Sequence, residues 1–157
     1  IGPGDWTKGT PKLFKMVAKG LPFYLPSVSG FVGVQDVVHA VDKAMESDFV
    51  KAERFLLVSE SLSQKDFLEK VADSLHTKAP RFAFPPSLGI PIGWLSEKFA
   101  SMRGTEPLIT VASMKQVRRK VYYDASKATR ELGIQYTSLE EVIAETGAAY
   151  LKENNNN

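Results

Sequence analysis

The sequence contains no cysteine, only two histidines and no long uninterrupted hydrophobic run. Without cysteine the chain can form no disulfide, thiolate nucleophile or cysteine-ligated zinc site, and a reducing compartment is permitted. No run of about 18 apolar residues is found, so no transmembrane helix is predicted, and no signal peptide is recognised. The formal net charge is only +2, which gives no reason to expect a nucleic-acid partner. We therefore expect a cytoplasmic protein that binds neither nucleic acid nor a membrane.

Catalytic and metal-binding motifs are scarce as well. His39 and His76 do not form a metal-binding spacing such as His-Glu-x-x-His, so structural or surface roles are favoured. Tyr123 and Lys127 match Tyr-x-x-x-Lys, in which a lysine one helical turn away can lower the pKa of a tyrosine. Because Tyr123 is predicted to end a strand, the pair lacks the helix that this chemistry needs. We assign no catalytic residue, no cofactor-binding residue and no metal ligand.

The composition is that of a folded protein. The chain has 157 residues, of which 43% are hydrophobic and 24% charged. This suits one globular domain, or a large piece of a bigger one. The sequence begins at Ile1 without an initiator methionine, as if cut from something longer. Residues 154–157 are four asparagines, which we treat as a polar tail, so that the folded part is predicted to span residues 1–153.

A strand followed by a helix is predicted near the middle of the first half. Residues 31–34 are apolar or small, as in a short strand, and Asp36 follows where the period changes to that of a helix. We expect Asp36 to cap this helix rather than act as an acid, and the strand 31–34 to pair with residues 121–123. The helix face expected to point inward consists of Val37, Val38, Ala40, Val41, Ala44 and Met45.

Capping residues and apolar periodicity predict the other elements. Ser63 with Asp66, and Ser138 with Glu141, have the spacing of a capping box, and each precedes an apolar helical pattern. A compact apolar run at 55–58 is typical of a buried strand. Residues 59–62 are expected to form a turn, and 23–25 a short extended piece. Further helices are predicted over residues 10–19, 91–102 and 125–132.

Several segments together resemble one family. They are 1–5 (IGPGD), 31–37 (FVGVQDV), 54–58 (RFLLV), 124–133 (DASKATRELG) and 138–141 (SLEE). Their order and sequence are similar to those in the C-terminal part of extended short-chain dehydrogenase/reductases. These belong to the NAD-dependent epimerase/dehydratase family, and the resemblance is greatest to dihydroflavonol-4-reductase-like proteins. No single segment is specific, whereas the ordered set is fairly specific.

The resemblance implies a fold, an activity and a missing partner. It implies an α/β class, the C-terminal portion of a Rossmann-type fold, mostly helical with a few short strands. The family's glycine-rich phosphate turn and its catalytic residues precede this portion, and the chain contains no such turn. NAD(P) is therefore expected in the parent protein but not on this chain alone, which is expected to be inactive. Because the strand at 55–58 would lack neighbours, we expect self-association or attachment to the missing N-terminal half.

The resemblance also suggests where a small-molecule substrate binds. The region after the Gly-Pro-Gly turn lines the family's substrate cleft, which makes Trp6, Phe14, Phe23 and Tyr24 the candidate substrate-binding residues. The arginine expected just before residue 31 is absent, which favours a carbonyl or alcohol substrate. The basic residues at 115–120 are interpreted as a solvated face or an anion contact. The alternatives are a nucleotide-sugar epimerase or dehydratase, and a helical interaction module without redox function.

Overall fold

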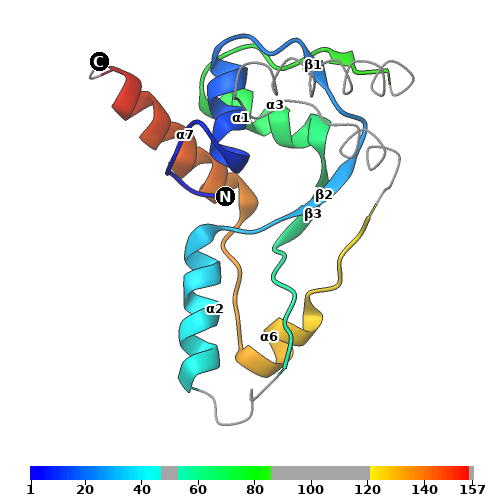
Figure 1. The fold of residues 1–157 in the computed structure, drawn as a ribbon, viewed down its shortest axis with the longest axis vertical. Coiled ribbons are helices and arrows are strands. Elements are labelled where there is room, and N and C mark those ends of the chain that lie inside the picture. Colours follow the sequence, from blue (N-terminus) through cyan, green and yellow to red (C-terminus); the bar gives the residue numbers. More distant parts are fainter. Residues whose placement is uncertain (47–52, 86–120, 156–157) are drawn as a thin grey trace, which may run out of the picture.

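The structure is a computed structural model that describes residues 1–46, 53–85 and 121–155 (Figure 1). The predicted helix over 91–102 and the basic residues at 115–120 lie outside the described residues. Figure 1 shows α1, α3 and α7 at one end, α2 and α6 at the other, and β2 and β3 between them. The elements, in chain order, are α1 (Gly9–Ala18), β1 (Phe23–Tyr24), β2 (Val28–Phe31), α2 (Val34–Glu46), β3 (Glu60–Ser63), α3 (Gln64–Ser74), β4 (Phe82–Ala83), α6 (Ser126–Leu132) and α7 (Leu139–Asn155).

The main hydrophobic core lies between α1, α3 and α7. The face predicted for α3 is buried, and α7 contributes Leu139, Ile143 and Tyr150 to the same cluster. The rings of Phe31 and Phe67 stack with centroids 4.3 Å apart, which joins strand β2 to this core. The apolar periodicity predicted for α3 and α7 is therefore confirmed, because their apolar faces are the ones that meet.

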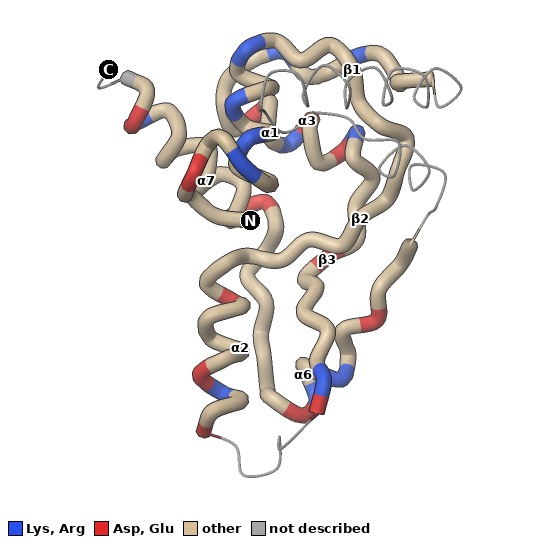
Figure 2. Tube along the Cα trace, in the orientation of Figure 1, with Lys and Arg blue, Asp and Glu red and all other residues tan. Residues whose placement is uncertain are grey.

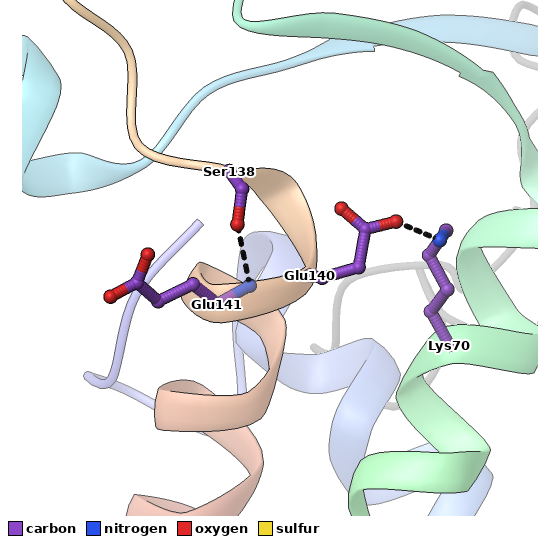
Figure 3. Close-up of polar contacts among 4 residues, drawn as sticks. All are labelled: Lys70, Ser138, Glu140 and Glu141. Carbon is purple, nitrogen blue, oxygen red and sulfur yellow. Dashed lines mark hydrogen bonds and ion pairs between the residues drawn. The ribbon is translucent and has the colours of Figure 1, made fainter.

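The N-termini of α3 and α7 are fixed by serine caps. The backbone N–H of Asp66 donates to Ser63 Oγ at 3.1 Å. That of Glu141 donates to Ser138 Oγ at 3.3 Å, as Figure 3 shows. The same figure shows the ion pair between Lys70 of α3 and Glu140 of α7. Its hydrogen bond lowers the pKa of Glu140 and raises that of Lys70. These contacts hold the two helices side by side.

The strand predictions are only partly right. The extended piece at 23–25 is confirmed as β1, which pairs in parallel with β4. However, β2 pairs antiparallel with β3, from Val28 opposite Ser63 to Phe31 opposite Glu60. The predicted pairing of 31–34 with 121–123 is therefore wrong, and so is the turn at 59–62. Tyr123 instead places its ring against Gly30, where an added Cβ would lie 2.8 Å from Tyr123 Cδ2.

The apolar run 55–58 forms no strand, which corrects the prediction of a buried one. Phe55 and Leu57 pack against Ala40 of α2 and Leu132 of α6, in a second, smaller cluster. Leu56, between them, is exposed. The alternation is that of a strand, but no described segment forms a ladder with it. A buried-type strand needs neighbours on both sides to satisfy its backbone, and here it has none.

Asp36 links this second cluster to the start of α7 and does not cap its own helix. Helix α2 begins two residues earlier, at Val34. The Asp36 side chain, 6% exposed, accepts hydrogen bonds from the backbone N–H and the hydroxyl of Thr137, the latter at 2.8 Å. The structural role expected of Asp36 holds, whereas the predicted cap is wrong. The backbone preceding Asp36 is already helical, and this turns its carboxylate toward a neighbouring segment instead of its own first turn.

The inward face predicted for α2 is also wrong. Within it, Ala40 is buried and Val37 and Ala44 are partly buried. The side chains of Val38, Val41 and Met45 are exposed. The helix packs its small residues against α6, while its larger apolar side chains point away from the described part of the chain.

Candidate functional site

A cavity of about 350 Å³ opens between α1, β1 and the start of α3. Its wall combines side chains of α1 with the segment 21–25, and Phe84 closes one side. The lining is predominantly apolar, as is usual for small-molecule pockets. The lining residues are Gly9, Lys12, Leu13, Met16, Leu21, Phe23, Tyr24, Leu25, Gln64, Leu68 and Phe84.

Backbone hydrogen bonds fix the wall formed by β1. The N–H of Leu25 donates to the side-chain oxygen of Gln64 at 2.7 Å. The N–H of Phe84 donates to the carbonyl of Tyr24 at 2.8 Å. The Phe23 and Phe84 rings meet edge to face, with centroids 6.2 Å apart. The aromatic side of the cavity is therefore held by β-type pairing together with ring packing.

Few polar groups face this cavity. Lys12, on α1, is the one charged side chain among the described lining residues. Tyr24 brings a phenol and Gln64 an amide, both of which can hydrogen-bond a neutral oxygen. A site of this kind can hold a largely apolar molecule and orient one polar or negatively charged end of it.

A second cleft of about 470 Å³, whose lining residues include more polar side chains, adjoins the first. Tyr24 and Leu25 line both and so separate them. The cleft runs beside β3 and receives hydroxyl-bearing side chains from Ser27, Ser61 and Tyr122. A ligand that reached past Tyr24 would meet these hydroxyl groups.

The structure separates the four candidate substrate-binding residues into two pairs. Phe23 and Tyr24 line the cavity. Trp6 and Phe14 are instead buried in the main core, 6.4 Å apart between ring centroids. Trp6 Nε1 donates to Glu153 at 2.7 Å, which ties the first loop to α7. Substrate contact stays a prediction for all four, and the structure brings only the first pair to the cavity.

Sequence reasoning missed Lys12, Gln64 and Phe84. Lys12 is one of two lysines on α1, whose other face is apolar, a pattern also typical of a solvated surface. Gln64 follows the Ser63 cap directly, where the sequence gives no sign that its side chain turns back toward Leu25. Phe84 had a weak signal, because it lies in a segment rich in proline and aromatic residues.

The Tyr-x-x-x-Lys match does not lie within one helix, and the strand predicted to end at Tyr123 is wrong, because residues 121–125 form neither strand nor helix. Tyr123 precedes α6 and is exposed, while Lys127 lies within that helix. The Lys127 ammonium contacts Glu53 at 2.6 Å and lies 4.9 Å from the centre of the Phe55 ring. This hydrogen bond raises the pKa of Lys127. The lysine is therefore engaged with Glu53 and Phe55.

Within the described residues, charged side chains of the two signs are mixed and form no metal or polyanion site. Figure 2 shows acidic and basic residues interspersed along the described chain. Among the residues that the structure describes, no group of three or more histidine or acidic side chains is placed to hold a metal ion. Both histidines are exposed. No helix in the described ranges is long and apolar enough to cross a membrane.

Comparison with known proteins confirms the expected fold. No family model matches the chain. Over 151 residues it is 26% identical to a protein of Synechocystis sp. (strain ATCC 27184 / PCC 6803 / Kazusa) named "Putative dihydroflavonol 4-reductase", a match that covers 92% of this chain and 44% of that protein. PA4631, a nucleoside-diphosphate-sugar epimerase from Pseudomonas aeruginosa, superposes with a TM-score of 0.72 and 18% identity, covering 98% of this chain and 45% of the other.

A second similar structure is the yeast methylglyoxal/isovaleraldehyde reductase Gre2 complexed with NADPH. Its TM-score is 0.57 and its identity 19%, over 99% of this chain and 45% of that one. The chain thus spans about half the length of the proteins it matches. The predicted α/β class, mostly helical with few short strands, is confirmed as part of the fold that these proteins share. The resemblance to dihydroflavonol-4-reductase-like proteins is confirmed as well.

Proposed function

We propose that this chain, which has the fold of part of an extended short-chain dehydrogenase/reductase, is the substrate-binding portion of an NAD(P)-dependent oxidoreductase. The parent protein transfers hydride between the nicotinamide and a carbonyl or alcohol carbon of a small molecule. The similarity to proteins named as reductases and epimerases supports the general class. The observation that carries the proposal for this chain is the apolar cavity beside β1.

The lining of the cavity favours a carbonyl or alcohol substrate with an apolar body. Leu13, Met16 and Phe23 offer hydrophobic surface, and burying such surface is the main source of affinity for small ligands. Lys12 and Tyr24 can orient one polar end. A nucleoside diphosphate calls for several cationic contacts, and the described lining has one cationic side chain.

The cofactor is proposed to bind outside these 157 residues. A pyrophosphate is typically held by a glycine-rich turn at a helix N-terminus, and the sequence has no such turn. When bound in the parent, NAD(P) supplies or accepts the hydride. The residues of this chain hold the substrate, exclude water from its apolar part and set its orientation. We accordingly propose that the isolated chain does not catalyse hydride transfer. A cytoplasmic location remains a prediction from the absence of cysteine.

Ligand binding to the cavity can be tested on the chain itself. An aromatic ketone of the size of acetophenone is titrated into the isotope-labelled protein, and backbone amide shifts are followed by NMR. We expect shifts at α1, β1 and Gln64, with a dissociation constant on the order of 1 mM. Met16→Trp fills the cavity and should weaken binding at least about tenfold. The matched control is Ala18→Trp, on the same helix at an exposed position, which should change binding less than about twofold.

The same titration distinguishes the alternatives. A nucleotide-sugar epimerase or dehydratase is favoured by the likeness to the Pseudomonas aeruginosa structure and by the hydroxyl-lined cleft beside Tyr24. If UDP-glucose shifts the amides around Ser27 and Ser61 at lower concentration than the ketone shifts those of the cavity, this alternative replaces our proposal. If neither compound shifts any amide at about 10 mM, both bind too weakly to be substrates of this cavity. The helical interaction module then explains the chain better than a substrate-binding role.

A further inference from the structure

The polar side chains that line the cavity beside β1 are mainly hydrogen-bond donors. Among the described lining residues they are Lys12, Tyr24 and Gln64. An ammonium carries three donors and no acceptor, whereas a phenol can donate or accept. The side-chain oxygen of Gln64 already accepts from the N–H of Leu25 at 2.7 Å. Its NH₂ group, which carries two donors, has no partner among the described residues.

The backbone acceptors of the β1 wall are already used within the fold. The carbonyl of Tyr24 accepts from the N–H of Phe84 at 2.8 Å. The carbonyl of Leu25 accepts from the N–H of Ser27, also at 2.8 Å. The wall therefore offers a ligand more donors than acceptors. The ligand group that complements it best is one that only accepts hydrogen bonds, and an ionised carboxylate is such a group.

The charge of Lys12 has no counter-charge in its described surroundings. Neither α1 nor the described lining of the cavity contains an acidic residue, and none of the ion pairs among the described residues includes Lys12. Lys15, on the same helix, differs in this respect, because it lines a separate cleft together with Asp5 and Glu153. Lys12 is thus the lysine of α1 that borders an apolar cavity without an acidic neighbour in the described lining.

A partly buried ammonium beside apolar surface favours an anion over a neutral polar group. Lys12 is partly buried, and its aliphatic stem can lie along the cavity wall while the charged end remains accessible. A hydrogen bond between two charged groups is roughly twice as strong as one between neutral groups. One cationic side chain also matches one negative charge, at the end of a molecule whose body contacts Leu13, Met16 and Phe23.

We propose that the substrate held in this cavity is a keto acid or hydroxy acid with an apolar body, and that Lys12 and the NH₂ group of Gln64 bind its carboxylate. This inference rests on the proposed function and names the substrate class of its site. Lys12 is then the residue that sets specificity for an acidic substrate, while the apolar lining holds the rest of the molecule.

Three ligands of similar size test the carboxylate contact on the isotope-labelled chain. They are acetophenone, 4-acetylbenzamide and 4-acetylbenzoate, and only the last is ionised at pH 7. Binding is followed by NMR. We expect 4-acetylbenzoate to bind about tenfold more tightly than either neutral compound, since hydrogen bonds to charged groups are the stronger ones. The side-chain NH₂ resonances of Gln64 should move with the acid and much less with acetophenone.

Substitutions on α1 and at its C-terminal end separate a contact with Lys12 from the effect of overall charge. Lys12→Met should reduce the preference for the acid to less than about twofold and leave acetophenone binding within about twofold of the wild type. Lys12→Arg keeps the charge and should keep most of the preference. The matched control is Lys19→Met, which removes the same charge from the exposed C-cap of the helix and should leave the preference unchanged. Lys12→Gln replaces Lys12→Met if the latter does not fold.

The possible results distinguish this inference from the proposed function. Equal affinity for all three compounds refutes the carboxylate contact and leaves the proposed function standing. Equal loss of the preference in Lys12→Met and Lys19→Met also refutes it, because the acid would then respond to net charge alone. If 4-acetylphenyl phosphate binds at least about tenfold more tightly than 4-acetylbenzoate, the anion is a phosphate and the assignment of an acid is overturned. Binding of the acid through Lys12 without any binding of acetophenone contradicts the proposed function, which depends on the apolar cavity, and supports the contact.

Discussion

Replacing Asp36 by alanine tests how the two clusters of the fold are held together. Asp36 is 6% exposed, and its carboxylate accepts hydrogen bonds from both the backbone and the hydroxyl of Thr137. Thr137 lies in the connection between α6 and α7, a hundred positions further along the chain. In Asp36→Ala the segment before α7 therefore loses its main polar attachment to α2.

The expected loss of stability follows from the two Thr137 groups that lose their acceptor. A hydrogen bond to a charged group contributes about 1.5–3 kcal/mol, and a buried donor left without an acceptor costs about 1–3 kcal/mol. Since Thr137 is only partly buried, water can satisfy some of the loss. We expect Asp36→Ala to lower the free energy of unfolding by about 3 kcal/mol. At about 2–4 °C per kcal/mol for a chain of this size, the Tm falls by about 6–12 °C.

Thermal unfolding followed by circular dichroism measures this change. The matched control is Asp42→Ala, which removes an exposed carboxylate from the same helix and should alter stability by less than about 0.5 kcal/mol. Asp36→Asn keeps one acceptor and is expected to fall between the wild type and Asp36→Ala. If Asp36→Ala and Asp42→Ala melt within about 2 °C of each other, the bond to Thr137 does not hold the two clusters together.

Three further outcomes are expected. Ser63→Ala removes the cap of α3 and should cost about 1 kcal/mol, unlike Ser29→Ala on the exposed face of β2; equal melting of the two would contradict the cap. The buried Tyr136 hydroxyl makes no hydrogen bond of normal geometry among the described residues, and burial raises its pKa, although the nearby Val58 backbone opposes this shift. Tyr136→Phe should therefore leave the Tm unchanged or raise it, and a fall of more than about 3 °C would reveal a partner. Because Lys70 lowers the pKa of Glu140, their pairing stabilises the fold above about pH 4.5 and is lost as the pH falls through that lowered pKa. Lys70→Met should melt below the wild type at pH 7 and together with it at about pH 2, and a difference that persists at the lower pH argues against the pair.

The helices of the main core could be predicted from the sequence because their signals are local. A capping serine and an apolar period of 3.6 act within a few residues, and both α3 and α7 start at the predicted positions. The left-handed conformation of Gly133, which ends α6, is equally local. The ordered set of family-like segments added the fold class, which the structural relatives confirm.

Strand pairing and the candidate site could not be predicted in this way. β2 pairs with β3 rather than with residues 121–123. Strand β1 has only two residues, which is too short for an alternation of apolar and polar residues to show which strand it pairs with. The cavity likewise depends on Gln64 folding back onto Leu25, a contact between residues 39 positions apart. Contacts between residues so far apart in the sequence depend on how whole helices and strands pack.

The sequence by itself determined that the described segments with capping residues and an apolar period become helices, and where α3, α6 and α7 begin or end. Only the tertiary structure decided which apolar residues are covered. Phe14 and Val38 are both apolar residues within an amphipathic helical pattern. Phe14 is nevertheless fully buried, whereas Val38 is half exposed. The period of a helix shows that it has an apolar face, but whether a partner covers that face depends on the arrangement of the other elements. On α2 the described part of the chain leaves Val38, Val41 and Met45 exposed, because none of its other elements packs against them.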